Sequence, residues 1–82
     1  MLYFLYWYGI IKVILYNADG TIRNWTEYEY DANGNMIKRT NYMADGMNSW
    51  SEHEYDAEGN TIKSTYYKSD GNIDCWYIPE YE

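Results

Sequence analysis

Short segments rich in aromatic and β-branched residues alternate along the chain with compact tetrads that end in glycine. The segments run for about eight to ten residues and favour Tyr, Trp, Ile and Thr, which is the composition and length of β-strands. The 3.6-residue apolar period of an amphipathic helix is absent. The pattern predicts six strands, at residues 5–16, 21–30, 35–42, 47–55, 60–67 and 72–81.

The five tetrads mostly carry Asp or Asn before the glycine. They are Asn17–Gly20, Asp31–Gly34, Met43–Gly46, Asp56–Gly59 and Lys68–Gly71. A glycine at the end of a type I turn supplies the positive φ that closes a three-residue hairpin with a bulge. We therefore expect an all-β fold, an antiparallel meander of about six strands built from tandem hairpins. The only proline, Pro79, falls in the last strand, where an edge position tolerates its missing donor.

The phrase Tyr30–Asn35 returns 25 residues later as Tyr55–Asn60, which marks a tandem repeat. We expect a single repeat domain over residues 1–82. It divides into an apolar N-terminal strand (1–15), repeats at 16–41 and 42–66, and a partial repeat at 67–82. The start inside apolar residues and the end part-way through a copy favour a fragment of a longer array.

Register follows from the turn, because the residue before a bulged type I hairpin pairs with the residue after its glycine. Counting outward from the second turn predicts these pairs: Asp31 with Asn35, Tyr30 with Met36, Glu29 with Ile37, Tyr28 with Lys38, Glu27 with Arg39 and Trp25 with Asn41.

Alternation along each strand then separates two faces of the sheet. The first face is expected to carry Tyr8, Ile10, Ile14, Tyr16, Ile22, Tyr28, Tyr30, Met36, Tyr42, Tyr55, Tyr67, Ile73, Tyr77 and Tyr81. The second is expected to carry Trp7, Ile11, Val13, Leu15, Trp25, Glu27, Glu29, Ile37, Trp50, Glu52, Glu54, Ile62, Tyr66, Trp76 and Ile78.

The third turn differs in spacing. Trp50 follows Gly46 by four residues, whereas Trp25 and Trp76 each follow a glycine by five. A one-residue slip would move Trp50 to the other face. A two-residue turn at Asp45-Gly46 would absorb the deletion, so a tighter third turn is predicted.

Neither face is cleanly polar, and a lone sheet would leave large aromatic patches in water, which soluble monomers seldom do. A chain of 82 residues has a thin core, and the single cysteine, Cys75, excludes an internal disulfide. The twelve tyrosines and four tryptophans are typical of partly solvated protein interfaces, because their rings are apolar and their O–H and N–H groups are polar. We expect a homodimer or higher oligomer that buries residues 1–16.

The net charge of −7 disfavours nucleic acid and anionic membranes as partners. Residues 1–16 are apolar, but they are too short for a comfortable helical span and are interrupted by Lys12. They also lack the basic region and cleavage site of a signal peptide, which leaves a truncated secretion signal as the alternative.

Candidate chemistry is sparse. Asp31–Asn35 imitates the start of a calcium loop, but its glycine stands at position 4 instead of 6 and no Glu follows at position 12, so a hairpin turn is favoured. The sequence predicts no metal site and no cofactor.

A row of four glutamates, Glu27, Glu29, Glu52 and Glu54, lies near Trp25 and Trp50. A glycosidase pair needs a pocket that shifts one pKa, and a flat sheet offers none. Cross-strand pairing is favoured instead. The only histidine, His53, is expected at the surface opposite Lys63, without the partners of a catalytic triad. The chain is therefore interpreted as non-enzymatic.

The phrase Tyr28–Asn35 and its copy Glu54–Asn60 resemble the tyrosine-aspartate (YD, or Rhs-type) repeat, and the similarity covers residues 16–71 best. The resemblance implies long β-hairpin strips that coil into hollow shells in bacterial toxins and cell-surface proteins. It also implies an extracellular or cell-surface location. This chain is far too short to close a shell alone.

A second similarity involves Tyr42–Trp50 and Tyr67–Trp76, which look like the aromatic-Asp-Gly repeats that bind choline or glucan on bacterial surfaces. Those repeats are nearer 20 residues long than the 25 to 26 found here. Two hypotheses remain: a structural module that associates with itself, and a module that binds carbohydrate or choline. Both use the same candidate residues: Trp7, Trp25, Trp50, Trp76, Tyr28, Tyr30, Tyr55 and Tyr66.

Overall fold

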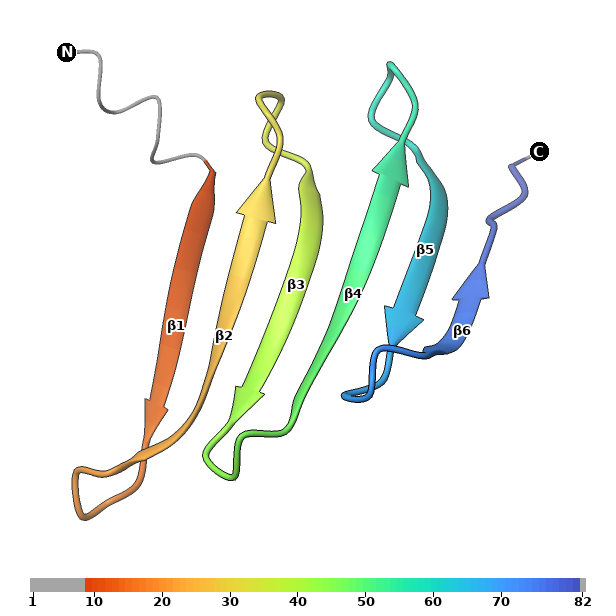
Figure 1. Ribbon diagram of the computed structural model, residues 1–82. Helices are drawn as coiled ribbons and strands as arrows, with labels where there is room; N and C mark the ends of the chain where they lie inside the picture. Colours follow the sequence, from red (N-terminus) through yellow and green to blue (C-terminus); the bar gives the residue numbers. More distant parts are fainter. Residues whose placement is uncertain (1–8, 82) are drawn as a thin grey trace, which may run out of the picture.

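The computed structural model describes residues 9–81 as one sheet of six antiparallel strands arranged in chain order (Figure 1). The strands are β1 (Ile10–Tyr16), β2 (Ile22–Tyr30), β3 (Met36–Met43), β4 (Asn48–Tyr55), β5 (Thr61–Tyr67) and β6 (Ile73–Tyr77). The all-β meander predicted from the sequence is confirmed. Trp7 and Tyr8, and the expected beginning of the first strand, lie outside the described residues.

The last strand ends earlier than expected. Ser64 pairs with Tyr77, and the next residue whose backbone would face β5 is Pro79. Because Pro79 has no N–H to donate, the ladder stops at Tyr77. The chain nevertheless stays near β5, since the Tyr81 hydroxyl donates a 2.8 Å hydrogen bond to the Thr61 carbonyl.

All five turns have the same backbone bonding, including the third. The Met43 amide donates to the Met47 carbonyl at 3.2 Å, and the Gly46 amide donates to the Met43 carbonyl at 2.9 Å. Gly46 has a φ of 86°, and the Asp45 carboxylate accepts the Met47 amide at 2.9 Å. The prediction of a tighter, two-residue third turn is therefore wrong.

A bulge, not a shorter turn, accounts for the spacing. In the β2–β3 pair, Tyr30 lies opposite Met36 but Glu29 lies opposite Lys38, so Ile37 is an extra residue. The β1–β2, β4–β5 and β5–β6 pairs contain similar shifts, whereas the β3–β4 register is regular. The hairpin without a bulge needs one residue fewer, which keeps Trp50 in phase with Trp25.

The bulges also correct the predicted register. Beyond Ile37 every pair moves by one residue: the predicted partners of Glu29, Tyr28, Glu27 and Trp25 are wrong. The observed pairs are Glu29 with Lys38, Tyr28 with Arg39, Glu27 with Thr40 and Trp25 with Tyr42. Since a shift of one residue reverses the face of a side chain, part of the predicted face assignment fails as well.

The sheet repeats a two-stranded unit three times. Each unit begins with an Ile-Lys-x-x-x-Tyr strand and ends with a Trp strand. The first strands contain Ile11-Lys12 to Tyr16, Ile37-Lys38 to Tyr42 and Ile62-Lys63 to Tyr67, and the second strands contain Trp25, Trp50 and Trp76. In the second unit, the Tyr55 hydroxyl donates to the Met36 carbonyl at 2.6 Å, as Tyr81 does to Thr61 in the third.

The described residues form a thin slab, with extents of 48 × 41 × 21 Å. Among residues 9–81 no hydrophobic side chain is buried, and the buried side chains are small and polar: Thr40, Ser51, Ser64 and Thr65. They lie in β3, β4 and β5, where neighbouring strands cover short side chains from both sides. Within residues 9–81 the sheet is therefore stabilised by the hydrogen bonds between strands and by cross-strand side-chain pairs, and not by a buried hydrophobic core.

Candidate functional site

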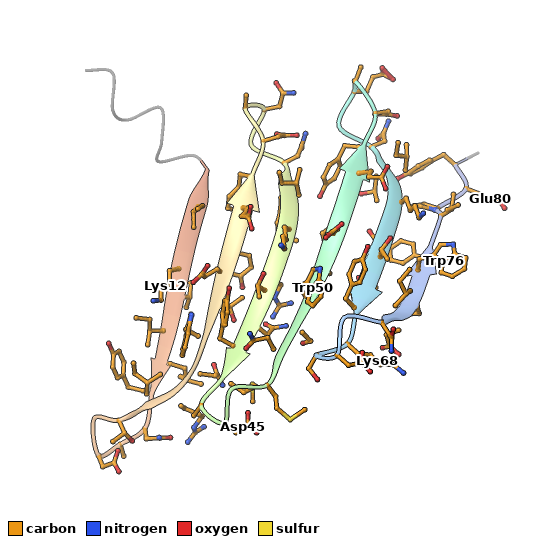
Figure 2. The ribbon with its side chains drawn as sticks, viewed as in Figure 1. Lys12, Asp45, Trp50, Lys68, Trp76 and Glu80 are labelled. Atoms are coloured by element: carbon orange, nitrogen blue, oxygen red, sulfur yellow. The ribbon has the colours of Figure 1, made fainter. Side chains whose placement is uncertain are left out.

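One side of the sheet gathers the tryptophans, and we call it the Trp face. Trp25 lies opposite Tyr42, Trp50 lies between Thr40 and Tyr67, and Trp76 lies opposite Thr65. Figure 2 shows Trp50 on β4 and Trp76 on β6 with their side chains. The expected common face of the three tryptophans is confirmed. Tyr42 and Tyr67 were assigned to the opposite face, and that assignment is wrong because of the bulges.

Two aromatic stacks recur on the Trp face. The rings of Trp25 and Tyr42 lie 5.0 Å apart at 11°, and those of Trp50 and Tyr67 lie 4.8 Å apart at 9°. Such offset pairs contribute about 0.5–1.5 kcal/mol beyond the area they bury. Each stack bridges the end of one unit and the beginning of the next.

A lysine covers each stacked indole. The Lys12 Nζ lies 5.2 Å from the Trp25 ring centre, and the Lys38 Nζ lies 5.9 Å from that of Trp50. Cations are attracted to the electron-rich face of an aromatic ring at this range. Each of these two indoles thus has a tyrosine stacked on it and an ammonium group over it, both supplied by the sheet.

The polar edges of the two indoles differ. The Trp50 Nε1 donates to the Glu52 carboxylate at 3.1 Å, whereas the Trp25 Nε1 is buried without a hydrogen-bond partner among the described atoms. An unsatisfied buried N–H costs about 1–3 kcal/mol. The first stack is therefore the less completely satisfied of the two.

Trp76 lacks such surroundings. It lies on β6 at the edge of the sheet with 59% of its surface exposed (Figure 2). At the opposite edge, Tyr16 on β1 is 55% exposed. By position in the repeat, Trp76 corresponds to Trp25 and Trp50, and Tyr16 corresponds to their stacking tyrosines. Of the rings at these repeat positions within residues 9–81, Trp76 and Tyr16 are the two on the outermost strands of the sheet.

The opposite side, which we call the Ser face, holds a small hydrogen-bonded cluster. His53 Nδ1 lies 2.8 Å from the Ser64 hydroxyl, and His53 Nε2 lies 3.0 Å from the Ser51 hydroxyl. The Tyr66 ring meets the imidazole edge-on at 6.1 Å. Burial lowers the pKa of His53 below its usual value of 6.5, because the neutral ring is favoured away from water.

A shallow hollow of about 170 Å³ opens beside this cluster. Its lining includes Arg39, Asn41, Ser51, Tyr66 and Asp74. The chemistry it offers is limited: Ser51 has only 6% of its surface exposed and Ser64 has none, so neither hydroxyl is presented to a substrate. Within residues 9–81 no group of three or more His, Cys, Asp or Glu side chains is placed to hold a metal ion.

Comparison with known proteins gives one match. Residues 16–63, more than half of the chain, match the family described as protein of unknown function (DUF2963). The chain belongs to the DUF2963 family. Comparisons with curated proteins and with solved structures find no match.

The DUF2963 match begins at Tyr16 and ends at Lys63, within β5. It includes the whole Trp25–Tyr42 stack and the bulge at Ile37. Tyr67 and Trp76 lie beyond it. The family match therefore covers one complete junction between units, and the second junction repeats it.

Of the other residues predicted for this DUF2963 chain, Tyr28 and Tyr66 lie on the Ser face. For Tyr66, predicted beside the tryptophans, this is a correction. Burial raises the pKa of Tyr66, and Tyr77 beside it raises that pKa further. Tyr30 and Tyr55 stand at strand ends, where the Tyr55 hydroxyl is occupied by the bond to Met36. Trp7 lies outside the described residues.

The sequence interpretation missed the Ser51–His53–Ser64 cluster. His53 lies opposite Ser64, not Lys63, because of the bulge beside Tyr55. The spacing of Ser51 and His53 is a usable signal, since residues two apart in a strand share a face. The partnership with Ser64 is not visible without the bulge. Similarly, Glu27 lies opposite Thr40 and not Arg39, whose guanidinium lies 5.8 Å over the Tyr28 ring.

Residues 9–81 contain no helix that is long and apolar enough to cross a membrane.

Proposed function

We propose that this DUF2963 chain is a non-enzymatic structural module that associates with copies of itself. One observation carries the proposal: among residues 9–81 no hydrophobic side chain is buried. Large apolar side chains are instead about half exposed on both faces and at both edges. Those of β1 are Ile10 at 58%, Ile11 at 49%, Val13 at 53% and Leu15 at 48%.

The energetics favour covering these side chains. Fully burying one large aliphatic side chain contributes about 1.5–3 kcal/mol. Since four β1 side chains are about half exposed, covering them would contribute about 3–6 kcal/mol in all before the entropy lost on association. The tyrosine- and tryptophan-rich composition is typical of such contact surfaces. The resemblance to YD repeats, which build extended β-scaffolds, supports the same proposal.

The test is the oligomeric state. Size-exclusion chromatography with light scattering, over a micromolar dilution series, should give a mass above that of one chain. Val13→Asp places a charge on the exposed apolar strand and should weaken the association. Ala57→Asp adds the same charge at an exposed turn and is the matched control. A stable monomer at micromolar concentration would refute the proposal.

The second candidate is binding of carbohydrate or choline. It is favoured by Trp76, whose exposed indole offers a face for a sugar ring or a quaternary ammonium group. At Trp25 and Trp50 a tyrosine is already stacked and a lysine already lies over the ring. Binding on a glycan array that is lost in Trp76→Ala would support this candidate. An absence of signal on glycans and on choline resin would remove it.

A further inference from the structure

We propose that copies of this chain join head to tail, the free edge of β6 pairing with the free edge of β1 of a second copy. The register is that of the β2–β3 and β4–β5 pairs. This inference rests on the proposed function, since it specifies how the self-association takes place. Among the strands formed by residues 9–81, β1 and β6 are the outermost, so each has one edge that no other described strand covers (Figure 1).

The two internal junctions establish the register because they repeat each other. At the first, Trp25 lies opposite Tyr42, Glu27 opposite Thr40 and Glu29 opposite Lys38. At the second, the same three pairs are Trp50 with Tyr67, Glu52 with Thr65 and Glu54 with Lys63. A junction thus consists of an aromatic stack, a middle pair, and an acid opposite a base.

The free edges carry the two halves of a third junction. On and just after β6, the matching positions hold Trp76, Ile78 and Glu80. On β1 they hold Tyr16, Ile14 and Lys12. Pairing two copies in this register places Trp76 on Tyr16, Ile78 on Ile14 and Glu80 on Lys12 of the second copy. These pairs restore the stack and the opposite charges of the internal junctions.

The middle pair is the most informative. Where the internal junctions have Glu opposite Thr, the free edges have Ile78 and Ile14. An isoleucine opposite Thr or Glu would contribute little stability to the junction, but two isoleucines opposite each other form a favourable apolar pair. Ile78 is 62% exposed in the single chain, so it has contact area to gain. The two edges therefore depart from the repeat in complementary ways.

The backbone groups on both edges are also correctly directed. The Asn17 backbone N–H donates to the Thr21 carbonyl, so the backbone polar groups of residue 17 point towards β2. Because these groups alternate in direction along a strand, those of Tyr16, Ile14 and Lys12 point away from the sheet. At the other edge, the Lys68 backbone N–H donates to the Asn72 carbonyl. By alternation Ser64 and its partner Tyr77 face each other, which turns Trp76 and Ile78 outward. Pro79 faces β5, so no outward position lacks an N–H.

Lys12 does not protect the β1 edge in the way that edge lysines often do. Its ammonium lies over the Trp25 ring on the Trp face. Lys38 makes the same contact with Trp50 although its strand is paired on both sides. A lysine in this position is therefore compatible with strand pairing.

Because the two edges differ, the contact is heterologous, and copies extend into rings or open filaments. Directed disulfides test this geometry. In a Cys75→Ser background, Leu15→Cys and Tyr77→Cys occupy positions equivalent to Asn41 and Thr26, which lie opposite each other. Such a pair without ladder bonds has a Cα separation of about 4.5 Å, which a disulfide spans.

Under mild oxidation the mixture of L15C and Y77C chains should form cross-linked dimers, whereas each variant alone should not. The off-register mixture of Val13→Cys with Y77C is the control and should cross-link more slowly. Cross-linking of L15C alone as readily as the mixture would indicate a symmetric β1–β1 contact and overturn the proposal. A sample that is associated by light scattering but does not cross-link would also overturn it and leave the proposed function standing. A monomeric sample would overturn both.

Charge complementation provides a second measurement that needs no disulfide. Ile78→Lys and Ile14→Glu should each raise the concentration needed for association by roughly tenfold, since each puts a charge opposite an isoleucine. Mixing the two variants creates Lys–Glu and Ile–Ile junctions in alternation and should restore association. Circular dichroism of each variant verifies that the strands remain. Failure of the mixture to recover, with both variants folded, would contradict the proposed register.

Discussion

The third turn, for which the sequence predicted too short a loop, provides the sharpest test of the structure. Gly46 has a φ of 86°, a left-handed conformation that L-residues rarely adopt. A Cβ on this residue would meet no heavy atom within 4 Å. Replacing Gly46 by L-alanine therefore perturbs backbone conformation alone, with no contribution from crowding.

The magnitude follows from two opposing effects. Forcing an L-residue into the left-handed region costs about 1–2 kcal/mol. Alanine also restricts the unfolded chain more than glycine does, which stabilises the folded state by about 0.4–1 kcal/mol. We expect Gly46→Ala to lower the free energy of unfolding by about 1 kcal/mol. D-Alanine at the same position restricts the unfolded chain equally but prefers positive φ, so it should be about 1–2 kcal/mol more stable than L-alanine.

The assay is urea unfolding of the three synthetic chains, at one fixed protein concentration because association shifts the midpoint. Tryptophan fluorescence reports the transition, and equal slopes of the free energy against urea confirm that the same surface is exposed. The comparison of the L- and D-alanine chains is the matched control, since they differ only in chirality. If their stabilities agree within about 0.3 kcal/mol, the left-handed conformation of Gly46 is refuted.

Three further changes give distinct readouts. Trp50→Ala should lower the free energy of unfolding by about 2–3 kcal/mol, because it removes the stack with Tyr67 and the half-buried area of the indole. It should also abolish the near-ultraviolet circular dichroism of the Trp50–Tyr67 pair, whereas Trp50→Phe should retain most of the stability. Burial lowers the pKa of His53, so stability should be complete above pH 6.5 and fall as the pH drops from 6.5 towards the folded-state pKa. Urea midpoints measured across that range should lose this dependence in His53→Asn. The backbone amide of Asn60 holds the pKa of Asp56 below its usual 3.8, so the stability it contributes is present above pH 3.8 and lost as the pH falls through the lowered pKa. The acid unfolding curve of Asp56→Asn should lack that part of the transition.

The meander itself could be predicted because its signals are local. Each of the five turns contains a glycine with positive φ, and in four of them Asp or Asn directly precedes that glycine. The strands between the turns are short and rich in residues that favour β-structure. The Asp31 turn illustrates this: its carboxylate accepts the amides of Asn33 and Asn35, each at 2.9 Å. Those bonds explain the Tyr-Asp phrase as turn chemistry.

Face assignments were less predictable because they depend on the bulges. A bulge adds one residue without any glycine or proline to mark it, and Ile37 is an ordinary strand residue. The consequence is large: Tyr42 and Tyr67, which the sequence predicts on the face opposite the tryptophans, are in the structure their stacking partners. The same cause explains why the sequence does not predict the contact between His53 and Ser64.

The regular β3–β4 hairpin shows what keeps the repeat in phase. It has the same turn bonding as the other hairpins but lacks their bulge, and it also has one residue fewer before its tryptophan. Chain length and bulge therefore vary together, while the face of the tryptophan stays constant. The feature that recurs between units is the aromatic ladder, in which Trp25 on β2 and Trp50 on β4 each stack on a tyrosine of the following strand. Among the strands that residues 9–81 form, β6 is the last, so Trp76 is the member of that ladder without a tyrosine stacked on it, and pairing β6 with β1 of a second copy would supply one.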